Sequence, residues 1–105
     1  MPDSWIQNGS GGRLSGAESA ELTRQIAGLA SAGLPMAHGL IALGEELPRG
    51  RLRRSMNELA RTLESGVTLD QALEKQSDTI PPHLRGLVVA GLRSGRLGDI
   101  LSRFS

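Results

Sequence analysis

The residues best suited to catalysis or metal binding are few and far apart. The chain has two histidines, His38 and His83, which fall on different predicted helices, and it has no cysteine. A zinc site needs three or four His, Cys or carboxylate ligands. No glycine-rich phosphate loop and no Ser-His-Asp pattern is present. The sequence therefore predicts no catalytic residues, no metal site, no cofactor and no enzyme activity.

The eleven acidic residues are the remaining candidates for acid–base chemistry. Most of them lie opposite stripes of leucine, where charged residues are expected on any amphipathic helix. A small hydrolase with a glycosidase-like carboxylate pair stays open as an alternative. The chain has one Phe, one Trp and no Tyr, so it offers no aromatic platform for a sugar.

The densest charged run is Arg49, Arg51, Arg53 and Arg54. One interpretation is a patch that binds an acidic protein surface or anionic lipid headgroups. The other is an ordinary solvated face at a turn. A third hypothesis, from a different class, is a small helical nucleic-acid-binding regulator that uses the same run. The formal net charge of +1 argues against that hypothesis, because such domains usually carry a basic surplus.

The elements that position these residues are predicted to be helices. Only 2% of the residues are aromatic, so the core must consist mainly of Leu, Ile, Val, Met and Ala. That composition favours helices over strands, which are rich in aromatic and β-branched residues. At 105 residues the chain has room for one domain. We expect an all-α fold, a compact antiparallel bundle of about six short helices.

Helix boundaries follow from capping residues. Ser15 with Glu18 and Thr68 with Gln71 fit capping boxes, in which two side chains satisfy free backbone N–H groups. Glycines in the left-handed conformation end helices, and prolines start or stop them. The first predicted helix begins near Ser15 and ends at Gly33. The next four are about 35–47, 49–65, 69–76 and 82–94, and a sixth begins near 97. Helix 82–94 is apolar nearly all round, so it is either central in the bundle or pressed against a partner.

The first residues differ in composition from the rest. Residues 1–16 are rich in Gly, Ser and Asn, which is typical of a disordered leader or linker. Residues 17–105 form the predicted helical domain. No apolar stretch approaches the roughly 20 residues of a membrane-spanning helix. The start also lacks the basic and apolar regions of a signal peptide.

Several segments resemble those of one known family. Residues 22–36, LTRQIAGLASAGLPM, resemble the opening signature of the type II secretion F family. Three further segments resemble its closing signature: TLDQAL at 68–73, IPP at 80–82 and AGLRSGRLGDIL at 90–101. Their order and spacing match, and the likeness covers roughly residues 21–104.

The resemblance implies a non-enzymatic cytoplasmic scaffold domain of an inner-membrane platform protein in type II secretion or type IV pilus assembly. Such a domain is normally followed by a transmembrane helix. Its implied partners are the assembly ATPase and other platform subunits, and homo-oligomers are possible. Arg24 and Gln25, in the opening signature, are candidate partner-binding residues together with the arginine run. Arg24 is equally open to a structural role. Val88, Leu92 and Arg93 are the candidate subunit interface.

Two positions depart from the family pattern. Family members usually carry Phe where this chain has Leu22, which is a small loss of core volume. They commonly carry Glu where this chain has Leu92. In some members that acid lies at a metal-linked subunit interface. Without the carboxylate we do not expect the metal, and we expect Leu92 to make a dry apolar contact instead.

Overall fold

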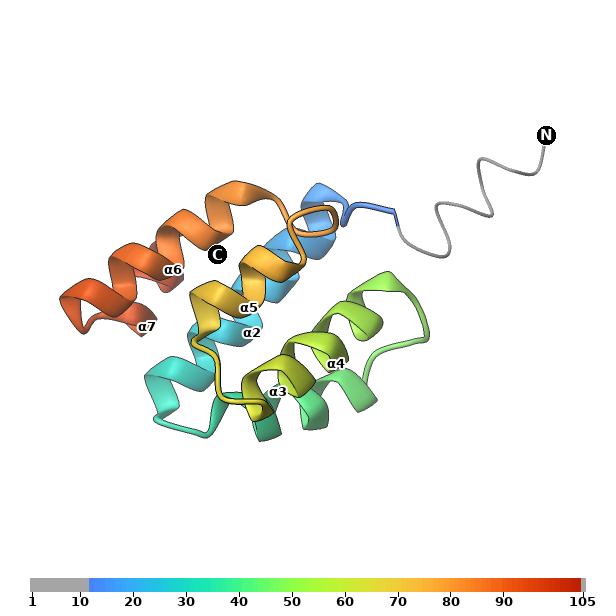
Figure 1. Ribbon diagram of the computed structural model, residues 1–105, viewed down its shortest axis with the longest axis horizontal. Coiled ribbons are helices and arrows are strands. Elements are labelled where there is room, and N and C mark those ends of the chain that lie inside the picture. Colours follow the sequence, from blue (N-terminus) through green and yellow to red (C-terminus); the bar gives the residue numbers. More distant parts are fainter. Residues whose placement is uncertain (1–11, 105) are drawn as a thin grey trace.

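The described residues, 12–104, form six α-helices and no strand in the computed structural model of the chain (Figure 1). The predicted all-α fold is confirmed. The helices are α2 (Gly16–Ala32), α3 (Met36–Glu45), α4 (Arg51–Glu64), α5 (Leu69–Lys75), α6 (Pro82–Ser94) and α7 (Leu97–Arg103).

The predicted helix caps are present. The Glu18 N–H donates to Ser15 Oγ at 3.1 Å, and the Ser15 N–H donates back to Glu18 Oε1 at 2.7 Å. The Thr68 N–H donates in the same way to Gln71 Oε1 at 3.0 Å. Gly33 and Gly95, with φ of 68° and 72°, end α2 and α6 in the left-handed conformation.

The junction between α3 and α4 differs from the prediction. Helix α3 ends at Glu45 and α4 begins only at Arg51, so residues 46–50 form a turn. Pro48 lacks a backbone N–H and disfavours a helical conformation at the residue before it. Arg49 therefore lies in this turn. The predicted helix 49–65 had wrongly placed it on a helix.

Residues 12–16, which were predicted to belong to the leader, lie within the described part of the chain. Leu14 is buried with 4% of its surface exposed, and its N–H donates to the Thr79 carbonyl at 2.8 Å. This bond ties the segment before α2 to the turn between α5 and α6. The earlier part of the predicted leader, residues 1–11, lies outside the described residues.

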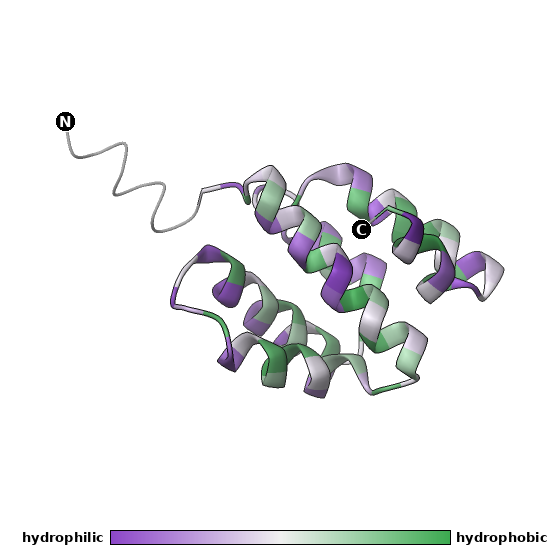
Figure 2. Cartoon of the chain, turned by 180° about the vertical axis from the view of Figure 1, so that it is seen from behind, coloured by the Kyte–Doolittle hydropathy of each residue, from purple (hydrophilic) through white to green (hydrophobic). Residues whose placement is uncertain are grey.

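The helices form a closed ring. Each helix packs against the next one along the chain, and α7 returns to pack against α2. In Figure 1, α2 lies between the α3–α4 pair and the α6–α7 pair. Hydrophilic and hydrophobic residues alternate along the helices in Figure 2, as expected for helices that are buried on one side.

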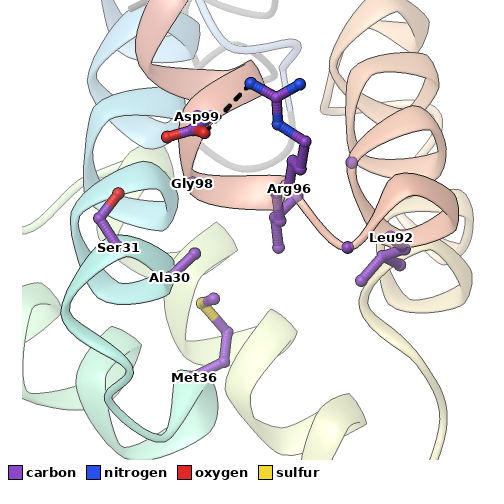
Figure 3. A pocket seen from close by; sticks show the side chains of 10 residues that line it. Ala30, Ser31, Met36, Leu92, Arg96, Gly98 and Asp99 are labelled. Carbon is purple, nitrogen blue, oxygen red and sulfur yellow. Dashed lines mark hydrogen bonds and ion pairs between the residues drawn. The ribbon is translucent and has the colours of Figure 1, made fainter.

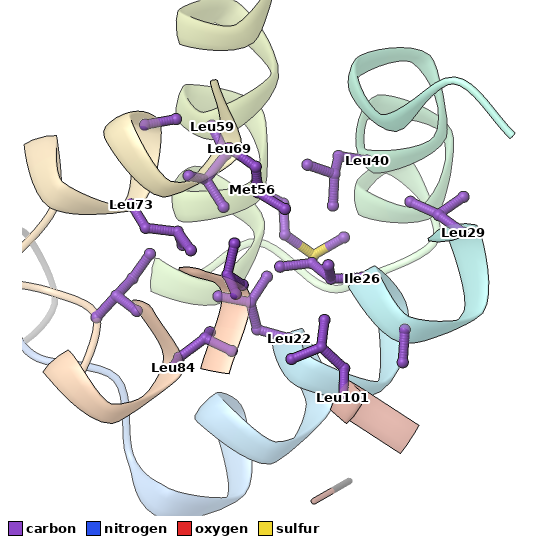
Figure 4. Close-up of a cluster of buried hydrophobic side chains, with 14 of the residues drawn as sticks. Leu22, Ile26, Leu29, Leu40, Met56, Leu59, Leu69, Leu73, Leu84 and Leu101 are labelled. Atoms are coloured by element: carbon purple, nitrogen blue, oxygen red, sulfur yellow. The ribbon is translucent and has the colours of Figure 1, made fainter. Parts of the chain in front are cut away.

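All six helices contribute to one hydrophobic core (Figure 4). The predicted leucine stripes supply most of its members. Side chains that are completely buried, from α2, α3, α4, α6 and α7, are Leu22, Ile26, Leu40, Met56, Leu59, Leu84, Val88 and Leu101. Leu73 of α5 is 2% exposed. Leu22, at the position where family members usually carry the larger Phe, is among these completely buried side chains.

Candidate partner-binding surface

The two signature segments, far apart in the sequence, meet at one depression on the surface. It has a volume of about 530 Å³ and lies where the end of α2, the start of α3 and the turn from α6 to α7 come together. Figure 3 shows its lining. The opening signature contributes Ala30, Ser31 and Met36, and the closing signature contributes Leu92, Arg96 and Asp99.

Glycines of the closing signature allow the surrounding helices to approach closely. A Cβ atom on Gly91 would lie 2.7 Å from Leu97 Cα, and one on Gly98 would lie 3.1 Å from Ser31 Cα. Neither backbone atom can move aside as a flexible side-chain tip would. Gly91 thus permits the contact of α6 with α7, and Gly98 permits the contact of α7 with α2. These signature residues hold the ring together.

An ion pair and an exposed leucine lie side by side in the lining of the depression. The Arg96 and Asp99 side chains form an ion pair at 3.4 Å, and both are exposed. Leu92 is 44% exposed beside them. Within the described residues no three His, Cys, Asp or Glu side chains are grouped so that they could hold a metal ion. His38 and His83 both lie exposed, on α3 and α6.

Arg24 and Gln25 both bind the same carboxylate on their own helix. Arg24 forms an ion pair with Glu21, and the Gln25 amide also donates to Glu21. Hydrogen bonds from Arg24 and Gln25 lower the pKa of Glu21 below its ordinary value. The Arg24 side chain is nevertheless 51% exposed. The ion pair with Glu21 is consistent with the structural role of Arg24, and the exposed guanidinium is also accessible to a partner.

Arg51 and Arg53 of the arginine run donate hydrogen bonds to other parts of the fold. Arg51 Nε donates to Glu18 Oε1 at 2.8 Å and so links α4 to the start of α2. The backbone hydrogen bond from Ser15, followed by the hydrogen bond from Arg51, lowers the pKa of Glu18. Arg53 Nη1 donates to the Leu47 carbonyl at 3.4 Å and closes the turn before α4.

The other two residues of the run, Arg49 and Arg54, are exposed. Arg54 lines a second depression of about 340 Å³, between the start of α4 and the end of α5. Lys75 and the carboxylates of Glu58 and Asp78 line it too, so its charge is mixed. The arginine run is therefore not one continuous basic surface.

The candidate subunit interface is corrected at one position. Val88 is completely buried in the core, so its side chain is not available to a partner. The turn of α6 that follows carries Leu92 and Arg93, which are both exposed. Arg85 and Val89 line the same side of α6 as these two residues, and the sequence analysis did not include them. Arg85, Val89 and Arg93 are spaced four residues apart, and this helical spacing would have placed them on one face.

No helix in the described part of the chain is long and apolar enough to cross a membrane.

The chain is similar to proteins of secretion and pilus assembly. Residues 22–105 match the sequence profile of the family described as Type II secretion system (T2SS), protein F. A protein transport protein, the HofC homolog of Escherichia coli K12, is 33% identical over 80% of this chain. Type II secretion system protein F of Vibrio cholerae is 30% identical over 82% of it. Type IV pilus assembly protein PilC of Pseudomonas aeruginosa is 30% identical over 90%.

These alignments cover 21%, 21% and 25% of the three relatives, so the chain spans about a fifth to a quarter of their length. The matched residues run from α2 through α7 and include both segments that line the first depression. The chain belongs to the type II secretion system protein F family.

Proposed function

We propose that this chain is a non-enzymatic scaffold domain of an inner-membrane platform protein, on the cytoplasmic side. In this role it binds the assembly ATPase and neighbouring subunits in type II secretion or type IV pilus assembly. The observation that carries the proposal is the family match, which spans the whole helical ring. The names of the relatives, a secretion protein F and a pilus assembly protein, support both settings.

The use of the signature residues supports a scaffold role. Gly91 and Gly98 permit close helix packing, and Leu22 and Leu101 are buried in the core. A scaffold depends on a stable shape, so residues shared with the family are expected to maintain packing. Other signature residues, such as Leu92 and Arg96, lie at the surface, where a partner can contact them.

For the ATPase we propose docking at the turn before α4. Arg49 is exposed there and makes no ion pair within the described residues, and Arg54 is exposed one turn further on. An acidic surface on the ATPase would complement the Arg49 cation. The nucleic-acid alternative requires the whole run, and it is disfavoured because Arg51 and Arg53 are engaged inside the fold.

The test is direct binding of the purified chain to the assembly ATPase of the same organism. We expect a complex whose affinity falls about threefold to tenfold in Arg49→Glu, with a larger difference at low salt, because exposed charges are screened. Arg61→Glu is the matched control. Arg61 is an exposed arginine at the other end of α4, paired with exposed Glu58. If no complex forms, or if both variants weaken it equally, the docking proposal is wrong.

A further inference from the structure

Helix α6 presents an unusual face to solvent. Its sequence, PHLRGLVVAGLRS, contains arginines and apolar residues but no acidic residue. Leu84, Val88 and Gly91 are buried and hold the helix on the core. Outside them lie Arg85, Val89, Leu92 and Arg93, which we call the α6 outer face. This face combines positive charge with exposed apolar surface.

The α6 outer face is concave on its α5 side. A depression of about 660 Å³ runs along it, lined by all four residues of the face and by Asp70 at the start of α5. Leu92 also borders the first depression (Figure 3), so this leucine lines both depressions. An exposed leucine that lines two concave surfaces can pack with side chains in both of them.

The charges around this depression are only partly balanced within the chain. Arg85 is paired with Glu74 at 3.5 Å, and both side chains are largely exposed. Asp70 accepts a hydrogen bond from the Thr68 hydroxyl at 2.6 Å. Arg93 makes no ion pair within the described residues. The Thr68 hydroxyl does not neutralise the Asp70 carboxylate, which lies at the α5 edge of the depression. On α6 itself, which has no acidic residue, Arg93 is the cation left for a partner, one residue after the exposed Leu92.

We propose that the α6 outer face binds an acidic amphipathic helix of a neighbouring subunit. The partner's apolar side chains pack against Val89 and Leu92, and its carboxylates pair with Arg93. Apolar anchors beside charge pairs are typical of a helix bound in a groove. This inference rests on the proposed scaffold role, because it specifies the chemistry of one partner in that assembly.

A second copy of the chain fits this face less well. Two-fold dimers use the same patch on both subunits. A dimer through the α6 outer face would bring Arg93 of both copies into one interface to which α6 contributes no acidic residue, and like charges across an interface are costly. A lipid surface also fits less well. Binding to anionic lipid typically uses clusters of four to eight basic residues, whereas this face has two beside a hollow.

The test is selection of helical peptides by the whole immobilised chain. A phage library of amphipathic helices carries leucine along one face and Glu, Gln or Lys at random in the flanking positions. We expect the wild-type chain to enrich Glu and the Arg93→Glu variant to enrich Lys. Leu92→Ala is expected to lower the affinity of the selected peptide about tenfold, since central apolar anchors dominate such interfaces. Arg61→Glu, on α4, should select as the wild type does.

The same variants give the outcomes that would overturn the inference. If the wild-type chain selects peptides without preference for Glu, or if Arg93→Glu also enriches Glu, an acidic partner helix is excluded. A dimer in sedimentation that Leu92→Ala dissociates shows that a second copy covers the face. Binding to phosphatidylglycerol vesicles that Arg93→Glu abolishes shows that lipid does. Thermal melting of each variant confirms folding. The library contains no ATPase, so the two proposals are tested separately. A failed peptide selection does not contradict the ATPase complex, and a missing ATPase complex does not contradict the peptide selection.

Discussion

At the scale of single residues, Glu18 connects local and tertiary structure. Its carboxylate accepts the Ser15 N–H in the cap of α2 and the Arg51 Nε from α4. It also lies in the first turn of α2, where the helix dipole stabilises a negative charge. One carboxylate thus starts a helix and joins two helices. The ionised form makes all of these interactions, and this is why the pKa of Glu18 is lowered.

This lowered pKa predicts a pH dependence of stability. A carboxyl whose pKa is below its ordinary value of 4.5 in the folded chain adds stability above that value. The added stability is lost as the pH falls through the lowered pKa. In Glu18→Gln we therefore expect a smaller free energy of unfolding near neutral pH and a shallower decrease on acidification. Urea denaturation between about pH 6 and pH 3 measures both.

Glu64→Gln is the control for this prediction. Glu64 is an exposed carboxylate outside any ion pair of the described residues, so its replacement should keep most of the wild-type pH slope. If Glu18→Gln also kept the wild-type slope, the Ser15 and Arg51 contacts would have no net effect on stability.

The residue scale also shows what was predictable from sequence. The cap of Ser15 with Glu18 was predicted because its partners are three residues apart and the geometry is local. The Glu18–Arg51 pair was not, because its partners are 33 residues apart and only the packing of α4 on α2 joins them. Val88 was assigned to an interface for a similar reason. On a helix that is apolar nearly all round, the pattern does not identify the buried side.

At the scale of elements, close helix contacts depend on glycines that face a neighbouring backbone. Helix α6 contains two glycines with opposite surroundings. Gly91 is buried against Leu97 of α7, while a Cβ on Gly86 would meet no atom within 4 Å. Replacing each glycine by alanine in turn therefore separates two effects: the steric clash, which is expected only at Gly91, and the change in helix propensity, which is common to both positions.

For Gly91→Ala we predict a loss of stability of about 1–3 kcal/mol, because the added methyl group must displace the Leu97 backbone. For Gly86→Ala we predict a gain of up to about 1 kcal/mol, because alanine is the better helix former. Urea denaturation of both variants measures the difference. Equal effects of the two substitutions would show that α6 and α7 can separate without cost, contrary to the packing described above.

Helix ends were predictable where caps are local, as at Gly33 and Gly95. The α3–α4 junction was not predicted correctly. There the apolar pattern continues through Leu47 and the charged pattern begins at Arg49, so periodicity gives no end for either helix. Gly50, with an extended φ of 165°, and Pro48 separate the two helices instead. As a result, Arg49 projects from a turn.

At the scale of the whole molecule, the six helices form one structural unit. The all-α class and the helix count followed from composition and capping, which are properties of short segments. The closure of the ring by α7 on α2 did not, because it depends on Gly98 lying against Ser31 far along the chain. Closure also brings the signature segments together, so the first depression was not predictable either.

The closed ring predicts that damage at α7 spreads to the entire chain. Leu101 is completely buried in the shared core, whereas Phe104, three residues later, is 63% exposed. We expect Leu101→Ala to cost about 2–5 kcal/mol and Phe104→Ala to cost within about 0.5 kcal/mol. Amide hydrogen exchange distinguishes a single unit from separate ones. In Leu101→Ala, protection should fall together in all six helices, including the distant α3–α4 pair. Loss confined to α6 and α7 would show that the two helix pairs open independently and that the ring does not act as one core.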